Sequence, residues 1–291
     1  MADKRVTEAD VVGEIRDGMT LGIGGWGSRR KPMSLVRAIA RSDVRDLTVV
    51  SYGGPDVGLL CAAGKVKKAV YAFCSLDSIA LEPHFRRARE AGEVSALELD
   101  EGMFLLGLQA AAWRVPFLPT RVGLGSDVLA RQDAIRTIVS PYRNELGEIE
   151  ELVAAPALPV DVALIHMHRG DARGNGQYLN VDPYMDDLFA MAAKQTFMSV
   201  ERVVPTDDLA SNGPVQTMRI SRLMTHGVVA APYGAHFTEC VPDYGRDEAF
   251  QRDYARTARD PDAWAAWKAT YLDCGDHDAY LRAIGRRADG A

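Results

Sequence analysis

Three glycines near the start of the chain have a spacing that suits a ligand-binding turn. Gly22, Gly24 and Gly27 satisfy the pattern Gly-x-Gly-x-x-Gly between an expected strand and an expected helix. A dinucleotide site of this type also needs an acidic residue at the end of the next strand, where residues 51–53 read Ser-Tyr-Gly. The turn therefore favours another anionic ligand, because glycine lets the backbone approach it closely and a basic helix N-terminus follows. A purely structural turn with solvated charges is the alternative.

A second candidate is an acidic residue at the junction of an expected strand and a helix. Asp100 is a plausible N-cap, and Glu101 begins the first turn. A carboxylate at such a junction faces the ligand-binding edge of a parallel sheet, where it could act as a general base or a nucleophile. From spacing alone, a solvated acid or a second cap is the more common outcome.

Two histidines and an aspartate form a third candidate. His166 and His168 alternate along an expected strand and share one face, and Asp171 follows, so the three could bind the metal of a hydrolase. No further ligand is found, and the glycines around Asn175 indicate a turn instead. We therefore predict no metal. The loop over residues 231–247, rich in glycine, proline and aromatic residues, fits a site wall or a packed crossover equally well.

The elements that must position these residues alternate between strands and helices. Strands are expected at residues 19–23, 47–52, 70–75, 94–99, 162–168 and 227–231. Helices are expected at residues 32–42, 81–91, 100–112, 185–193, 247–258 and 262–272. This order predicts an α/β fold with an open, mostly parallel sheet, helices on both faces and ligand-binding loops at one edge. We expect one domain over residues 1–291, with a helical segment from about residue 246 and an irregular excursion or hairpin at 132–159.

The composition excludes several classes of protein. The 291 residues are 47% hydrophobic and carry a net charge of −6, which fits a globular protein and argues against a nucleic-acid binder. No apolar run approaches the roughly 20 residues of a membrane span, and the N-terminus lacks the pattern of a signal peptide. Four widely spaced cysteines predict a reduced, cytoplasmic chain whose thiols are unreactive.

Taken together, these segments resemble the α subunits of class I coenzyme A transferases over most of residues 10–245. The strand and glycine turn of that family match residues 17–27, its Asp-x-x-Gly-Asn signature matches Asp171–Asn175, and Pro-x-Gly-Ala-His matches Pro232–His236. The resemblance implies a coenzyme A transferase-like fold and a β subunit, commonly in an α2β2 assembly. In those transferases the nucleophilic glutamate lies on the β chain in a Ser-Glu-Asn-Gly segment, which this sequence lacks.

One departure points to a branch of the family. Typical α subunits carry Gln-Gly where this chain has Glu101 and Gly102. The chain is more similar to the α subunits of bacterial hydrolases that open the last steroid ring in cholesterol or bile-acid breakdown. This resemblance implies that Glu101 is catalytic and activates water for retro-Claisen-like cleavage of a cyclohexenone carboxyl-CoA thioester. Coenzyme A would then be part of the substrate, and no separate cofactor is predicted.

The same resemblance assigns substrate contacts to the glycine turn. Its amides or an arginine would stabilise an oxyanion, its tryptophan would wall the apolar ring, and its cations would hold a carboxylate or a phosphate. The predicted substrate-binding residues are Gly24, Gly25, Trp26, Gly27, Arg29, Arg30 and Lys31. Solvated basic residues are the alternative for the three cations. For the whole chain, the alternatives are a transferase that moves coenzyme A between carboxylic acids and a non-catalytic partner subunit.

Overall fold

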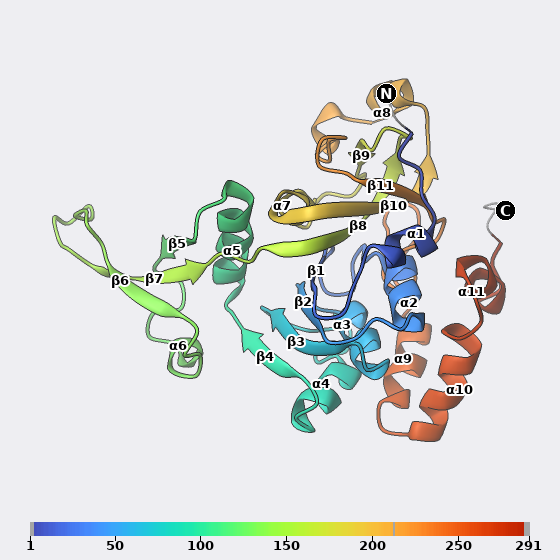
Figure 1. Cartoon of the computed structure of the whole chain (residues 1–291), viewed down its shortest axis with the longest axis horizontal. Helices are drawn as coiled ribbons and strands as arrows, with labels where there is room; N and C mark the ends of the chain where they lie inside the picture. Colours follow the sequence, from blue (N-terminus) through green and yellow to red (C-terminus); the bar gives the residue numbers. More distant parts are fainter. Residues whose placement is uncertain (1–2, 212, 288–291) are drawn as a thin grey trace.

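The computed structural model describes residues 3–211 and 213–287 and is built around one mixed sheet (Figure 1). The main strands lie in the order β11-β10-β8-β1-β2-β3-β4, and each neighbouring pair along this path is parallel. The short strand β9 pairs antiparallel with β8. The strands of this sheet are β1 (Thr20–Ile23), β2 (Leu47–Ser51), β3 (Val66–Tyr71), β4 (Ser95–Glu98), β8 (Val160–Gly170), β9 (Gly176–Gln177), β10 (Ala193–Val203) and β11 (Gly227–Ala230).

Helices cover both faces of this sheet. Along β8, Val162 and Leu164 join one apolar core with α2 and α3, whereas Ala163 and Ile165 join a second core with α5 and α7. The helices are α1 (Glu8–Gly13), α2 (Met33–Arg41), α3 (Pro55–Ala62), α4 (Pro83–Glu90), α5 (Glu101–Trp113), α6 (Asp127–Ala130), α7 (Asp186–Ala192), α8 (Thr206–Ser211), α9 (Glu248–Thr257), α10 (Pro261–Tyr271) and α11 (His277–Ala283), with a 3-10 turn at Val215–Thr217. The predicted α/β class with a mostly parallel, doubly covered sheet is confirmed.

A second, antiparallel sheet projects from the body as an arm (Figure 1, left). Its order is β5-β7-β6, from β5 (Phe117–Thr120), β6 (Arg136–Val139) and β7 (Glu151–Pro156). The hairpin of β6 and β7 is the one expected within residues 132–159. The arm follows α5 directly along the chain, so the helix that begins at Glu101 also leads into it.

Two strand predictions need correction. The strand expected at residues 70–75 lies earlier, at Val66–Tyr71, because the lysines at 67 and 68 occupy strand positions that did not read as apolar. The long strand β10 was not predicted, although it lies between β8 and β11 in the sheet. Among the described residues, no helix is both long enough and apolar enough to cross a membrane.

Candidate functional site

Four neighbouring parallel strands end at one edge of the sheet and bring the predicted site together. The chain leaves β1 into the glycine turn, β2 into Tyr52, β3 into Phe73 and β4 into the start of α5. The Tyr52 ring stacks on Trp26 at a centroid distance of 4.4 Å and also meets Phe104 at 4.4 Å. Phe73 packs against Trp26 at 5.2 Å. These rings form one aromatic cluster between the glycine turn and α5.

Glu101 is the first residue of α5, and its side chain is exposed. The Asp100 carboxylate caps this helix by accepting a hydrogen bond from the Gly102 amide at 2.7 Å, as the sequence predicts. The Tyr52 hydroxyl donates to the main-chain oxygen of Glu101 at 3.0 Å. A helix N-terminus favours negative charge, so the site is suited to an ionised carboxylate. Its catalytic role stays a prediction.

The amides of the glycine turn already donate hydrogen bonds to acceptors within the chain. Those of residues 24–27 donate to the main-chain oxygens of Leu164, Arg29 and Tyr52 and to the carboxylate of Asp186. A Cβ at Gly24 would lie 2.1 Å from that carboxylate, and Gly25 has a φ of +76°, so both positions require glycine. This placement does not support the predicted oxyanion contact by these four amides, because each already has an acceptor.

Two of the three cations after the turn are buried in ion pairs. Arg30 lies 2.9 Å from Asp186 and Lys31 lies 3.1 Å from Asp56, with all four side chains 1% exposed or less. Burial lowers the pKa of Lys31, although its carboxylate partner opposes that shift. These positions do not support substrate binding by Arg30 and Lys31. Arg29 also donates to the Asp77 carboxylate at 3.1 Å, but its side chain is 41% exposed and remains able to reach a ligand.

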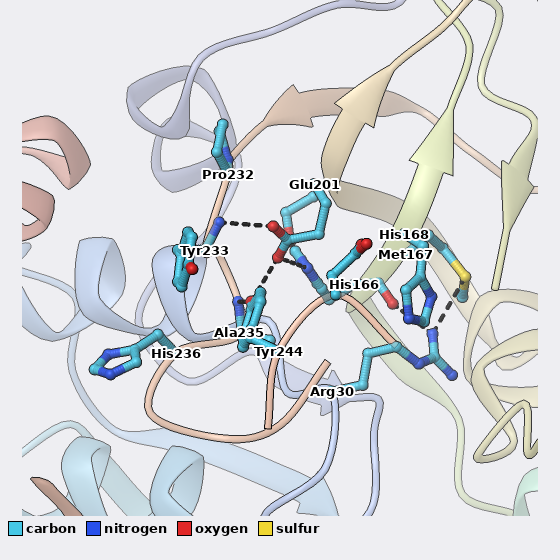
Figure 2. Close-up of polar contacts among 12 residues, drawn as sticks. Arg30, His166, Met167, His168, Glu201, Pro232, Tyr233, Ala235, His236 and Tyr244 are labelled. Carbon is cyan, nitrogen blue, oxygen red and sulfur yellow. Dashed lines mark hydrogen bonds and ion pairs between the residues drawn. The ribbon is translucent and has the colours of Figure 1, made fainter. Parts of the chain in front are cut away.

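The predicted His-x-His pair braces a loop instead of opening onto a site. His166 pairs with Ser199 through Nδ1 and with Glu201 through Nε2, both at 2.8 Å (Figure 2). Glu201 also accepts hydrogen bonds from the Tyr233 amide at 2.7 Å and the Tyr244 hydroxyl at 2.5 Å. The network therefore ties β8 and β10 to the loop that follows β11.

The contacts in this region give little support to a metal site. His166, Glu201 and Cys240 lie close enough together to share an ion. However, both nitrogens of His166 already have partners, and those of His168 contact the Leu179 amide and the Val241 oxygen. Burial raises the pKa of the Cys240 thiol well above its ordinary value, which disfavours the thiolate that metals bind.

Asp171 and His236 also have partners within the chain. The Asp171 carboxylate accepts hydrogen bonds from the amides of Arg173 and Asn175, while Gly174 adopts a φ of +100°. This is the turn that the sequence predicts. His236 contacts the Tyr280 hydroxyl at 2.6 Å and the Asp247 carboxylate at 3.2 Å, and burial lowers its pKa to about 4. The Asp-x-x-Gly-Asn and Pro-x-Gly-Ala-His signatures thus shape the framework behind the site.

A hollow of about 550 Å³ opens beside the aromatic cluster. Phe73 belongs to both, and Tyr71, Leu81 and Phe85 add further apolar wall. Arg86 lies at the same hollow and pairs with Glu90. This volume is within the range of pockets that hold small organic ligands, so there is apolar room beside Phe73, the ring that packs against Trp26.

Sequence reasoning missed several residues that organise the site. Tyr52 directly follows β2 and Phe73 lies two residues after β3, positions that mark the ligand-binding edge of a parallel sheet. Asp186, the first residue of α7, accepts from the glycine turn across 161 residues of chain. Nothing local in the sequence indicates this hydrogen bond between the Gly25 amide and Asp186.

The family model for coenzyme A transferase matches residues 5–244 of this chain. The chain is 56% identical over 289 residues to the cholesterol ring-cleaving hydrolase IpdA subunit of Rhodococcus jostii (strain RHA1), an alignment that covers 99% of this chain and 97% of the relative. It is 53% identical over 280 residues to the subunit of the same name from Mycobacterium tuberculosis (strain ATCC 25618 / H37Rv), covering 96% of each chain.

Solved structures of similar fold are also known. Glutaconate coenzyme A-transferase from Acidaminococcus fermentans superposes with a TM-score of 0.89 at 26% identity, covering 97% of this chain and 93% of that one. A variant of the decarboxylase AibA/AibB superposes with a TM-score of 0.78 at 27% identity, covering 92% and 100%. Both likenesses extend over nearly the whole chain, and the names of these relatives describe multi-subunit proteins.

Proposed function

The chain belongs to the coenzyme A transferase family, and from this premise we propose that it is the α subunit of a hydrolase of steroid catabolism. Its substrate is a cyclohexenone carboxyl-CoA thioester, in which it opens the last steroid-derived ring. The main support is the 56% identity to a cholesterol ring-cleaving hydrolase subunit over 99% of the chain. The exposed carboxylate of Glu101, at the anchored start of α5, supplies a group suited to this chemistry.

Glu101 acts as the general base in this proposal. It takes a proton from water, and the resulting hydroxide adds to the ring ketone that lies β to the thioester. The carbon–carbon bond between the ketone carbon and the α-carbon then breaks. Its electron pair remains on the α-carbon as a thioester enolate, which accepts the proton from Glu101. The products are the ring-opened thioester and a new carboxylic acid, which ionises by releasing its proton to solvent, with one water consumed.

The remaining site residues bind the substrate and shape the site around it. Trp26 walls the apolar ring. Arg29, which is partly exposed and pairs with Asp77, is the cation of the turn that can hold a substrate carboxylate or a phosphate of coenzyme A. Gly24, Gly25 and Gly27 allow the turn that presents them. Coenzyme A enters as part of the substrate, and the site needs no separate cofactor. The partner is a β subunit, in an α2β2 complex of the cytoplasm.

The decisive variant is Glu101→Gln, co-expressed with the β subunit. Ring opening should fall by at least ~10²-fold, because glutamine cannot accept the proton, while assembly and thioester binding persist. The matched control is Glu93→Gln, which alters a carboxylate just before β4 that pairs with Arg87 and should leave turnover near that of the wild type. Near-normal turnover by the Glu101 variant would rule out the assignment.

The same assay separates the hydrolase from a coenzyme A transferase. Turnover of the thioester is measured by product mass with water alone and with an added carboxylic acid. The hydrolase needs no acceptor acid and incorporates one oxygen from labelled water. A strict requirement for the acid, with coenzyme A appearing on it, would contradict the proposal.

A further inference from the structure

One buried side chain connects the glycine turn to the proposed catalytic glutamate. Tyr52 is fully buried, and its ring lies nearly parallel to Trp26, with an interplanar angle of 15°. Phe104, on the first turns of α5, packs against the same ring at 4.4 Å. Tyr52 therefore contacts both the residue proposed to wall the substrate and the helix that carries Glu101.

The main chain of Tyr52 is held from the side of the glycine turn. Its carbonyl oxygen accepts hydrogen bonds from the Gly27 amide at 3.1 Å and from the Lys31 ammonium at 2.7 Å. Lys31 is itself anchored by Asp56 at 3.1 Å and by the Ser51 hydroxyl at 2.8 Å. A charge-assisted bond inside the protein is stronger than an exposed one, so the position of Tyr52 is tightly defined. The buried Lys31 therefore helps to fix the main chain of Tyr52.

The hydroxyl of Tyr52 connects this fixed residue to Glu101. It donates to the main-chain oxygen of Glu101 at 3.0 Å, in the first turn of α5. Burial raises the pKa of Tyr52, and the nearby Glu101 and Asp100 carboxylates raise it further, so the hydroxyl remains a donor at any working pH. The first turn of a helix is otherwise prone to fraying, and the Asp100 cap provides a second restraint here.

We infer that Tyr52 is a positioning residue, which sets Glu101 relative to the glycine turn through its hydroxyl and sets Trp26 through its ring. The inference rests on the proposed role of Glu101 and extends it. Tyr52 itself makes no contact with the reacting atoms in this account. Its two functions can be separated, because one belongs to a single oxygen and the other to the aromatic ring.

The variant Tyr52→Phe tests the hydroxyl in the assembled complex. A misplacement of about 1 Å can cost on the order of 10²-fold in rate, so we expect kcat to fall by at least ~5-fold. KM should stay within about twofold, because the ring still stacks beneath Trp26. The control is Tyr280→Phe, which removes a buried hydroxyl bonded to His236 at 2.6 Å on the C-terminal helix α11. It should shift the melting temperature by a similar amount and leave kcat unchanged.

The variant Tyr52→Leu tests the ring. It should raise KM at least ~3-fold in addition to lowering kcat, since the stacking partner of Trp26 is lost. An unchanged kcat for Tyr52→Phe overturns the inference, as does an equal fall in kcat for Tyr280→Phe. Glu101→Gln is measured beside them. If it is inactive while Tyr52→Phe matches the wild type, only this inference fails; if Glu101→Gln is active, the proposed general base fails.

Discussion

At the scale of single residues, Glu82 is a carboxyl that the fold buries completely. It precedes α4 and caps it, with the Phe85 amide donating to Oε2 at 2.6 Å. A Cβ at Gly58 would lie 2.0 Å from its carboxyl carbon, so the side chain fills a space that only glycine leaves open. Burial raises the pKa of Glu82 to about 8, and the acid is therefore mostly protonated at neutral pH.

This burial predicts the pH dependence of a Glu82→Gln variant. Between its ordinary pKa of 4.5 and about 8, the folded wild type binds more protons at Glu82 than the unfolded chain does. The wild type therefore loses stability as the pH rises through this window. Glutamine does not titrate, so the melting temperature of the variant minus that of the wild type should increase from pH 5 to pH 8. Melting curves of both proteins across this range check it, and a flat difference would contradict it.

Residue types indicated some roles well and others poorly. Asp100 and Glu101 follow a strand and begin a helix, a local pattern that predicts both the cap and an exposed carboxylate. Arg30 and Lys31 share an equally simple local pattern, yet both are buried, because their partners come from distant segments. A sequence shows that a cation is present but not which distant carboxylate will pair with it. The exposure of Arg30 and Lys31 could therefore not be predicted, whereas the cap at Asp100 could.

At the scale of elements, the cap of α5 holds both the helix and its first residue. Replacing Asp100 by alanine should cost about 1 kcal/mol of stability through the lost cap. It should also lower kcat, because Glu101 follows the cap directly. The control Asp276→Ala removes the cap of α11, which accepts from the Ala279 amide at 2.8 Å, and should cost similar stability with kcat unchanged. Denaturant unfolding and turnover are measured on both; equal turnover would count against the role of the cap.

Helices and strands were predicted to a similar extent, and α1, α3, α6, α8 and α11 were missed. The spacing of apolar residues and the caps located α2, α4, α5, α7, α9 and α10 within a few residues. The strand β10 was missed, because its residues read Ala-Lys-Gln-Thr-Phe-Met-Ser-Val-Glu-Arg-Val and mix polar with apolar positions. Three of its polar side chains, Thr196, Ser199 and Glu201, are buried and bonded within the fold. Burial of this kind follows from tertiary contacts that no local pattern encodes.

At the scale of the whole molecule, α5 and the arm that follows it carry an unusual surface. Most of the large exposed apolar side chains of the described residues lie between 105 and 149, among them Trp113, Val139, Tyr142 and Leu146. The loop that follows β5 also reaches the start of α5, where Val122 would lie 3.1 Å from a Cβ at Gly102. Exposed apolar surface of this extent is typical of chains that work in complexes.

The isolated chain should therefore be nearly inactive. We expect less than about 1% of the turnover of the complex, because Glu101 is open to water and a closed site strengthens the electrostatic interactions that catalysis uses. Adding the separately purified β subunit should restore turnover and raise the mass measured by light scattering above the 31.7 kDa of one chain. Full turnover by the chain alone at the same concentration would contradict a shared site.

The anchors of the glycine turn impose an order on the biosynthesis of the protein. The Gly25 amide needs Asp186, and the Arg30 amide needs the main-chain oxygen of Glu239. A nascent chain that has emerged only to residue 160 contains β1 to β4 and Glu101 but none of these acceptors. Long-range pairings form late, and domains fold as units when their last partners arrive. The glycine turn and Glu101 thus both leave the ribosome before the acceptors that fix the turn, so an incomplete chain holds the proposed base beside a turn that is not yet anchored.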